Sequence, residues 1–126
     1  MTKQSIVILH GWGSNPSRWI AIHDSLQALA KNMGDAIHIP LLPGFDGEEP
    51  QEALDIDDYV KWLEEYIENE GLKNVALVGH SNGGRIAMRY AAKHHEVKKL
   101  VLIGAAGIPN TNISLKKIVF LGLAKG

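Results

Sequence analysis

Short apolar runs alternate along this chain with longer stretches of helical periodicity, and this alternation restricts the possible folds strongly. The apolar runs lie at residues 5–9, 36–39, 75–79 and 99–103. Strands that alternate with helices usually pair in parallel, because each helix carries the chain back to the start of the next strand. The pattern therefore predicts an α/β fold, with a mostly parallel sheet of about four strands and helices on both faces in a three-layer sandwich.

Three helices are expected between these strands. The first begins near Pro16 and ends at Gly34, which are residue types typical of helix starts and ends. The second covers about 57–69, with one apolar and one acidic face, and the third begins directly after Ser81. The apolar segment from Ile113 to Leu123 is too short to cross a membrane, and we expect it to form a helix that packs against the fold.

Ser81 lies at the junction between the third predicted strand and the third predicted helix. Glycines two residues away on either side, Gly79 and Gly83, complete the pattern Gly-x-Ser-x-Gly of a nucleophile elbow. Side chains at these two positions would collide in so sharp a turn. The serine hydroxyl would stand at the carboxyl end of the sheet, beside a helix amino terminus whose dipole favours negative charge. The pattern predicts that Ser81 is a catalytic nucleophile.

A second glycine-containing motif, His-Gly-Trp-Gly at residues 10–13, follows the first predicted strand. Loops that leave the carboxyl ends of neighbouring parallel strands converge, so this loop and Ser81 can share one crevice. We expect the backbone N–H groups of Asn82 and Trp12 to form an oxyanion hole, with Gly11 or Gly13 as alternatives to Trp12. The candidate substrate-binding residues are Gly11, Gly13 and Phe45.

Four motifs occur in a familiar order: His-Gly-Trp-Gly, Leu-Pro-Gly-Phe at 42–45, Val-Gly-His-Ser-Asn-Gly-Gly-Arg at 78–85 and Lys-Leu-Val-Leu-Ile-Gly at 99–104. Over residues 4 to about 108 the chain resembles the amino-terminal portion of an α/β-hydrolase-fold protein of the serine hydrolase type. The resemblance implies that Ser81 is the nucleophile and that Trp12 and Asn82 supply the oxyanion donors. It also assigns residues 1–108 to the core domain and 109–126 to the start of a helical cap or lid.

The chain departs from this family in the rest of the catalytic triad, which follows the order serine, acid, histidine. The only histidines after Ser81 are His94 and His95, and no acidic residue follows Glu96. On a continuous helix these histidines would lie roughly 20 Å from the serine hydroxyl, whereas a base must lie within about 3 Å. We expect His10 to brace the oxyanion loop, with an improvised base role as the alternative. The base and acid are therefore expected beyond residue 126.

The composition argues against several other classes of protein. The chain has no cysteine, which excludes disulfides and a thiol nucleophile, and its net charge of −1 gives no reason to expect a nucleic-acid partner. No phosphate-binding, dinucleotide or metal-ligand pattern occurs, so no cofactor or metal is expected. We expect a cytoplasmic protein that has no membrane span and acts on a small-molecule substrate; the sequence indicates no oligomeric state.

The favoured hypothesis is a serine hydrolase that cleaves an ester, thioester, amide or activated carbon–carbon bond through an acyl-enzyme. One alternative is a binding or interaction module on a hydrolase-like half-fold, without turnover. Another is an acyltransferase or lyase on the same fold.

Overall fold

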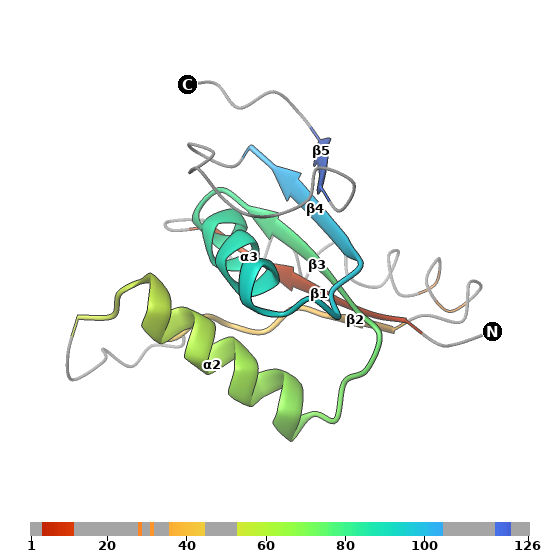
Figure 1. Ribbon diagram of the computed structural model, residues 1–126, viewed down its shortest axis with the longest axis horizontal. Coiled ribbons are helices and arrows are strands. Elements are labelled where there is room, and N and C mark those ends of the chain that lie inside the picture. The colour runs from red at the N-terminus through yellow and green to blue at the C-terminus, as the bar shows by residue number, and fades with distance from the viewer. Residues whose placement is uncertain are drawn as a thin grey trace.

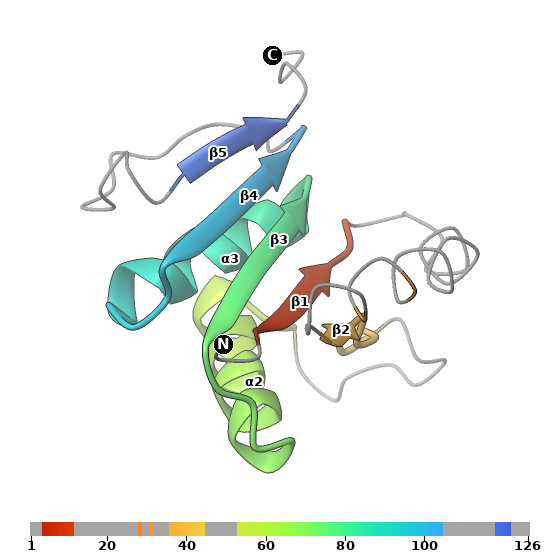
Figure 2. The ribbon, with the colours of Figure 1, turned by 90° about the vertical axis from the view of Figure 1, so that its right-hand side faces the viewer.

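The computed structural model describes residues 4–11, 28, 31, 36–44, 53–104 and 118–121. Within them the elements follow in the order β1 (Ser5–Leu9), β2 (Ala36–His38), α2 (Ile56–Asn69), β3 (Val75–His80), α3 (Asn82–Lys93), β4 (Lys99–Ile103) and β5 (Ile118–Leu121). The strands form one parallel sheet in the order β2-β1-β3-β4-β5, which Figure 2 shows as a twisted array. The α/β fold and the parallel sheet predicted from the sequence are confirmed.

The helix α2 owes its position in the chain to local capping and to its amphipathic sequence. The Asp55 carboxylate accepts a hydrogen bond from the Asp58 N–H, and the Asp58 carboxylate accepts one from the Asp55 N–H, both at 2.9 Å. This reciprocal pair satisfies two backbone donors at the helix start. The helix ends before Gly71, whose φ of 63° is one that glycine adopts readily.

The main hydrophobic core lies between the sheet and the two helices α2 and α3, which cover the same face (Figure 1). Alternate residues of the central strands point into it, as expected for a strand repeat of two. Its fully buried members include Leu9, Leu77 and Leu100 from the strands, Leu63 from α2 and Ile86 from α3. A second cluster on the other face centres on Ile8 and Ile37.

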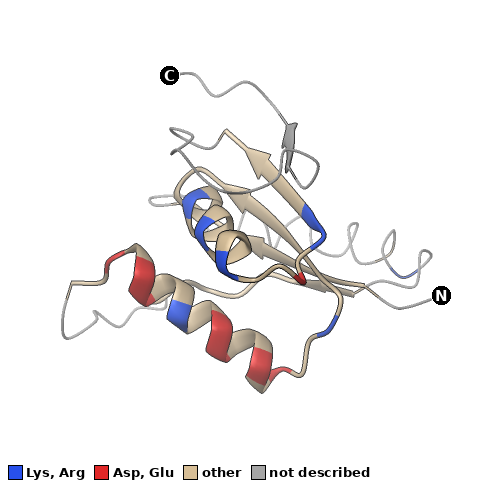
Figure 3. Cartoon of the chain, viewed as in Figure 1, with Lys and Arg blue, Asp and Glu red and all other residues tan. Residues whose placement is uncertain are grey.

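Complementary charges join the two helices at the rim of this core. Figure 3 shows acidic residues along α2 and basic residues along α3. Arg89 bonds to Asp57 at 3.1 Å, and Lys93 bonds to Glu64 at 3.2 Å. These side chains are mostly exposed, so each pair contributes at most about 1 kcal/mol. The buried apolar surface, and not the ion pairs, holds the helices on the sheet.

One expectation about the carboxyl-terminal segment is wrong. Residues Ile118–Leu121 form β5, which pairs in parallel with β4, whereas the sequence pattern favoured a helix across Ile113 to Leu123. A four-residue apolar run fits a buried strand as well as a buried helix, and a strand here pairs with β4, which otherwise ends the sheet. The assignment of 109–126 to a cap is not tested, and the other residues of that segment lie outside the described part of the chain.

The first predicted helix lies almost entirely outside the described residues. Only positions 28 and 31 of that predicted helix are described, and both are helical. Whether helices cover both faces therefore stays a prediction. None of the helices in the described part of the chain has the length and apolar character that crossing a bilayer requires.

Candidate active site

Ser81 occupies the turn between β3 and α3 in a backbone conformation that few non-glycine residues adopt. Its φ is 52° and its ψ is −118°. The surrounding backbone fixes this conformation, because the Ser81 N–H donates to the Ile103 carbonyl at 3.1 Å and the Ser81 carbonyl accepts from the Gly84 N–H at 2.9 Å. Strain of this kind costs on the order of 1–3 kcal/mol and is found mostly at functional sites.

The glycines on either side of Ser81 are required by close backbone contacts. A Cβ on Gly79 would lie 2.5 Å from the Gly84 Cα, within the first turn of α3. A Cβ on Gly83 would collide with the Leu9 carbonyl oxygen and lie 2.7 Å from the His10 carbonyl oxygen. Both positions therefore require glycine, as the sequence predicted. The absence of a side chain at Gly83 also lets α3 pack closely against the end of β1.

The ends of β1 and β3 meet at Ser81, as the convergence of parallel strands predicts. A Cβ added to Gly11 would lie 2.9 Å from the Ser81 Cβ and 3.1 Å from the His80 carbonyl oxygen. Gly11 is thus the described residue of the His-Gly-Trp-Gly motif that adjoins the nucleophile candidate. The other expected members of this wall, Trp12, Gly13 and Phe45, lie outside the described residues.

Asn82 begins α3 immediately after Ser81 and is only 8 % exposed. The first N–H groups of a helix have no partner within it, so the Asn82 backbone N–H has the position that an oxyanion donor needs. Its side-chain Nδ2 is buried and makes no hydrogen bond to the described residues. The oxyanion role of Asn82 stays a prediction.

His10 is completely buried and has a bracing role. Its Nε2 accepts a hydrogen bond from the Leu42 N–H at 3.1 Å, and its Nδ1 lies 3.2 Å from the Gly11 carbonyl oxygen. These contacts fit a neutral ring that carries its proton on Nδ1. Burial lowers the pKa of His10, an effect that the hydrogen bond to Gly11 only partly offsets. With both ring nitrogens engaged in the backbone, His10 is poorly suited to act as the base.

The loop that contains Leu42 is held from a second side by α2. The Tyr59 hydroxyl donates to the Pro43 carbonyl at 3.1 Å. The sequence pattern predicts Tyr59 only as part of an apolar helix face and does not reveal this contact. A tyrosine in a buried stripe generally needs a partner for its hydroxyl, and that requirement is the signal that could have indicated a nearby carbonyl.

His94 and Glu96 lie at the far end of α3 from Ser81 and interact with each other. His94 caps the carboxyl end of the helix, and its Nδ1 lies 3.1 Å from a Glu96 carboxylate oxygen. The helix between Ser81 and His94 has 12 residues, which is a length of about 18 Å at ~1.5 Å per residue. His94 cannot reach the serine hydroxyl, as the sequence spacing predicted, and Glu96, two residues further on, cannot reach it either.

The described residues bring together the nucleophile candidate, the start of α3 and the end of β1, but no general base. They contain no group of three or more histidine or acidic side chains placed to hold a metal ion. The arrangement can present a serine hydroxyl beside backbone donors, which is the first half of an acyl-transfer site.

Comparisons with known proteins agree with this arrangement. Residues 4–120 match the family described as the alpha/beta hydrolase fold. The pimeloyl-[acyl-carrier protein] methyl ester esterase of Shewanella woodyi is 36 % identical over 105 residues, which cover 82 % of this chain and 36 % of that protein. The (lyso)-N-acylphosphatidylethanolamine lipase of Mus musculus is 33 % identical over 115 residues, which cover 85 % of this chain and 32 % of that protein.

A solved structure of an esterase from Exiguobacterium antarcticum has a TM-score of 0.70 and 31 % sequence identity, and the match covers 82 % of this chain and 38 % of the esterase. This chain thus spans only about a third of the length of the curated relatives that it matches.

Proposed function

Since the chain belongs to the alpha/beta hydrolase fold family, we propose that it is part of a serine hydrolase that cleaves an ester-type bond through an acyl-enzyme at Ser81. The observation that carries this proposal is the position of Ser81, which is held at a φ of 52° between β3 and α3. The esterase and lipase names of its relatives support a carboxylic ester as the substrate class. A cytoplasmic location stays a prediction.

In the proposed reaction the Ser81 oxygen attacks the carbonyl carbon of the substrate and loses its proton to a base. The carbonyl oxygen becomes negatively charged, and the backbone N–H groups of Asn82 and Trp12 donate hydrogen bonds to it. The tetrahedral intermediate collapses, and the leaving alcohol departs with the proton that the base returns. Water then attacks the carbonyl carbon of the acyl-serine and gives a proton to the base. The second tetrahedral intermediate collapses, the acid product leaves, and the base returns the proton to the Ser81 oxygen.

The base and its orienting acid are proposed to lie in the chain beyond residue 126. Among the described residues, the two nitrogens of His10 are occupied, and His94 lies at the other end of α3. The matched relatives are about three times as long as the matched segment, which leaves room for both groups. Sequencing the gene past the codon for Gly126 tests this proposal, which requires an acidic residue and then a histidine after further strands.

Kinetics of the full-length protein on a short p-nitrophenyl ester test the role of Ser81. We expect Ser81→Ala to lower kcat by roughly 1,000-fold or more, with little change in the melting temperature, because the variant keeps binding but loses the nucleophile. Ser5→Ala, on β1, is the control and is expected to keep its activity.

The alternatives predict different results in the same assay. A binding module would show no turnover in the wild type, and Ser81→Ala would change nothing. An acyltransferase would consume the ester much faster when an acceptor alcohol is added than with water alone.

A further inference from the structure

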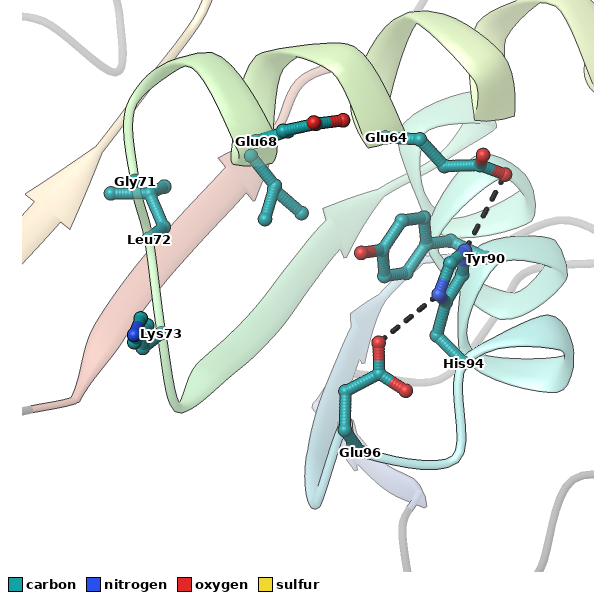
Figure 4. A pocket seen from close by; sticks show the side chains of 9 residues that line it. Glu64, Glu68, Gly71, Leu72, Lys73, Tyr90, His94 and Glu96 are labelled. Atoms are coloured by element: carbon teal, nitrogen blue, oxygen red, sulfur yellow. Dashed lines mark hydrogen bonds and ion pairs between the residues drawn. The ribbon is translucent and has the colours of Figure 1, made fainter.

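A cavity lies at the end of the sheet opposite Ser81, between the last turns of α2 and α3. Its volume is about 420 Å³, and side chains from both helices and from the loops that follow them line it (Figure 4). Ser81 is not among its lining residues, and the lining residue on α3, Tyr90, lies more than two helical turns further along that helix. The cavity is therefore distinct from the proposed active site.

Negative charge dominates the wall of this cavity. It contains three carboxylates, from Glu64, Glu68 and Glu96, and one ammonium group, from Lys73. Glu64 bonds to Lys93 at 3.2 Å, and one oxygen of Glu96 bonds to His94 at 3.1 Å. Neither Glu68 nor Lys73 makes an ion pair within the described part of the chain. The Glu68 carboxylate and the second carboxylate oxygen of Glu96 therefore remain available to a cation.

Tyr90 provides a second, independent indication of a ligand. The residue is only 4 % exposed, and its ring stacks on His94 with a centroid distance of 4.0 Å. Figure 4 shows its hydroxyl pointing into the cavity, and this group makes no hydrogen bond to any described residue. Burial, followed by the charges of Glu96 and Glu64, raises the pKa of Tyr90 to about 12, so the hydroxyl stays neutral. The side chain is buried while its hydroxyl faces the cavity without a partner from the described residues, so this hydroxyl can accept a hydrogen bond from a ligand.

The geometry of the wall favours an organic cation over a metal ion. The described carboxylates and histidines do not converge in a group of three that could coordinate one metal. Apolar side chains, Ile67 and Leu72, form another part of the lining. Two carboxylates and a hydroxyl beside an apolar wall suit an ammonium group that carries a hydrocarbon chain, because the charged end finds acceptors and the chain finds apolar surface.

We propose that this cavity binds a primary alkylammonium ion. The three N–H donors of the ammonium group are directed to the Glu68 carboxylate, the Glu96 carboxylate and the Tyr90 hydroxyl oxygen. A short alkyl chain lies against Ile67 and Leu72. The ammonium group of Lys73 lines the same cavity and competes with the bound ion for its carboxylates.

Titration of the full-length protein with n-butylammonium chloride tests the proposal, with sodium chloride at the same ionic strength as the reference. Calorimetry on the wild type is expected to show saturable binding of one ion per chain. Both Glu68→Gln and Tyr90→Phe are expected to weaken binding by about threefold or more, since the first removes the negative charge beside the ion and the second removes one hydrogen-bond acceptor. Lys73→Gln is expected to strengthen it.

Glu65→Gln is the matched control, because Glu65 is exposed on the same helix, does not line the cavity and undergoes the same change in charge. Its affinity should equal that of the wild type. Equal weakening by Glu65→Gln and Glu68→Gln would indicate a diffuse charge effect and overturn the proposal. Absence of saturable binding, or unchanged affinity in Tyr90→Phe with a normal melting curve, would overturn it as well.

Discussion

At the scale of single residues, Gly11 is the glycine whose added Cβ would meet the side chain of Ser81 itself. The distance of 2.9 Å from a Cβ at position 11 to the Ser81 Cβ is shorter than real Cβ atoms allow. We predict that Gly11→Ala displaces the serine and lowers kcat/KM by on the order of 100-fold, because misplacement of a nucleophile by about 1 Å has that effect. Ester hydrolysis with the full-length protein measures it.

Gly71→Ala is the control for this substitution. Gly71 has a φ of 63°, and a Cβ there would meet no atom within 4 Å. The variant should lose about 1–2 kcal/mol of stability through backbone strain and keep its activity. Full activity in Gly11→Ala would contradict the close contact between the two strand ends.

The burial of His10 predicts a dependence of stability on pH. Its folded-state pKa is lowered below the ordinary value of 6.5, so the unfolded chain binds the proton more readily. This contribution is complete above about pH 6.5 and is lost as the pH falls through the folded-state pKa. We predict that melting temperatures fall below pH 6.5 and that His10→Gln flattens this limb, whereas His95→Gln, at an exposed position, leaves it unchanged. Equal flattening by both would exclude His10 as the cause.

The residues of the site differ in how far the sequence could reveal them. Ser81, Gly79 and Gly83 were predictable, because a short local pattern encodes the turn. The bond between His10 and the Leu42 N–H was not, because the two residues lie 32 positions apart and no local sequence pattern connects them. The oxyanion role of Trp12 stays a prediction.

At the scale of elements, the packing of α2 depends on a few buried side chains. Leu63 is 0 % exposed and lies in the core between α2 and the sheet. We predict that Leu63→Ala destabilises the protein by about 2–5 kcal/mol through lost burial and a residual cavity. Arg89→Ala, which removes an exposed ion pair with Asp57, should cost less than about 1 kcal/mol. Denaturant unfolding measures both, and similar values would contradict an apolar origin of helix docking.

Long, strongly patterned elements were predicted well, and short ones less well. The helix expected at about 57–69 is observed at Ile56–Asn69. It was predictable because its apolar stripe repeats over several turns and acidic residues mark its first turn. The run at Ile118–Leu121 was interpreted as part of a helix, and it forms a strand. Four apolar residues carry no usable periodicity, so pairing with β4 decides the conformation.

At the scale of the whole molecule, the described chain contains a nucleophile candidate without its base. The sheet order β2-β1-β3-β4-β5 brings the ends of β1 and β3 together at Ser81. The relatives are about three times as long as the segment that matches them, and the activity proposed here belongs to a protein of that size. Order along the sheet, and not proximity in the sequence, therefore assembles the site.

The most direct test of the central claim is to label the full-length protein with a fluorophosphonate and map the adduct by mass spectrometry. This reagent reacts with a serine that is activated as a nucleophile. We predict a single adduct on the peptide that contains Ser81, and none after substitution of Ser81 by alanine. An adduct on another serine, or an active enzyme that takes up no label, would contradict the assignment of Ser81 as the nucleophile.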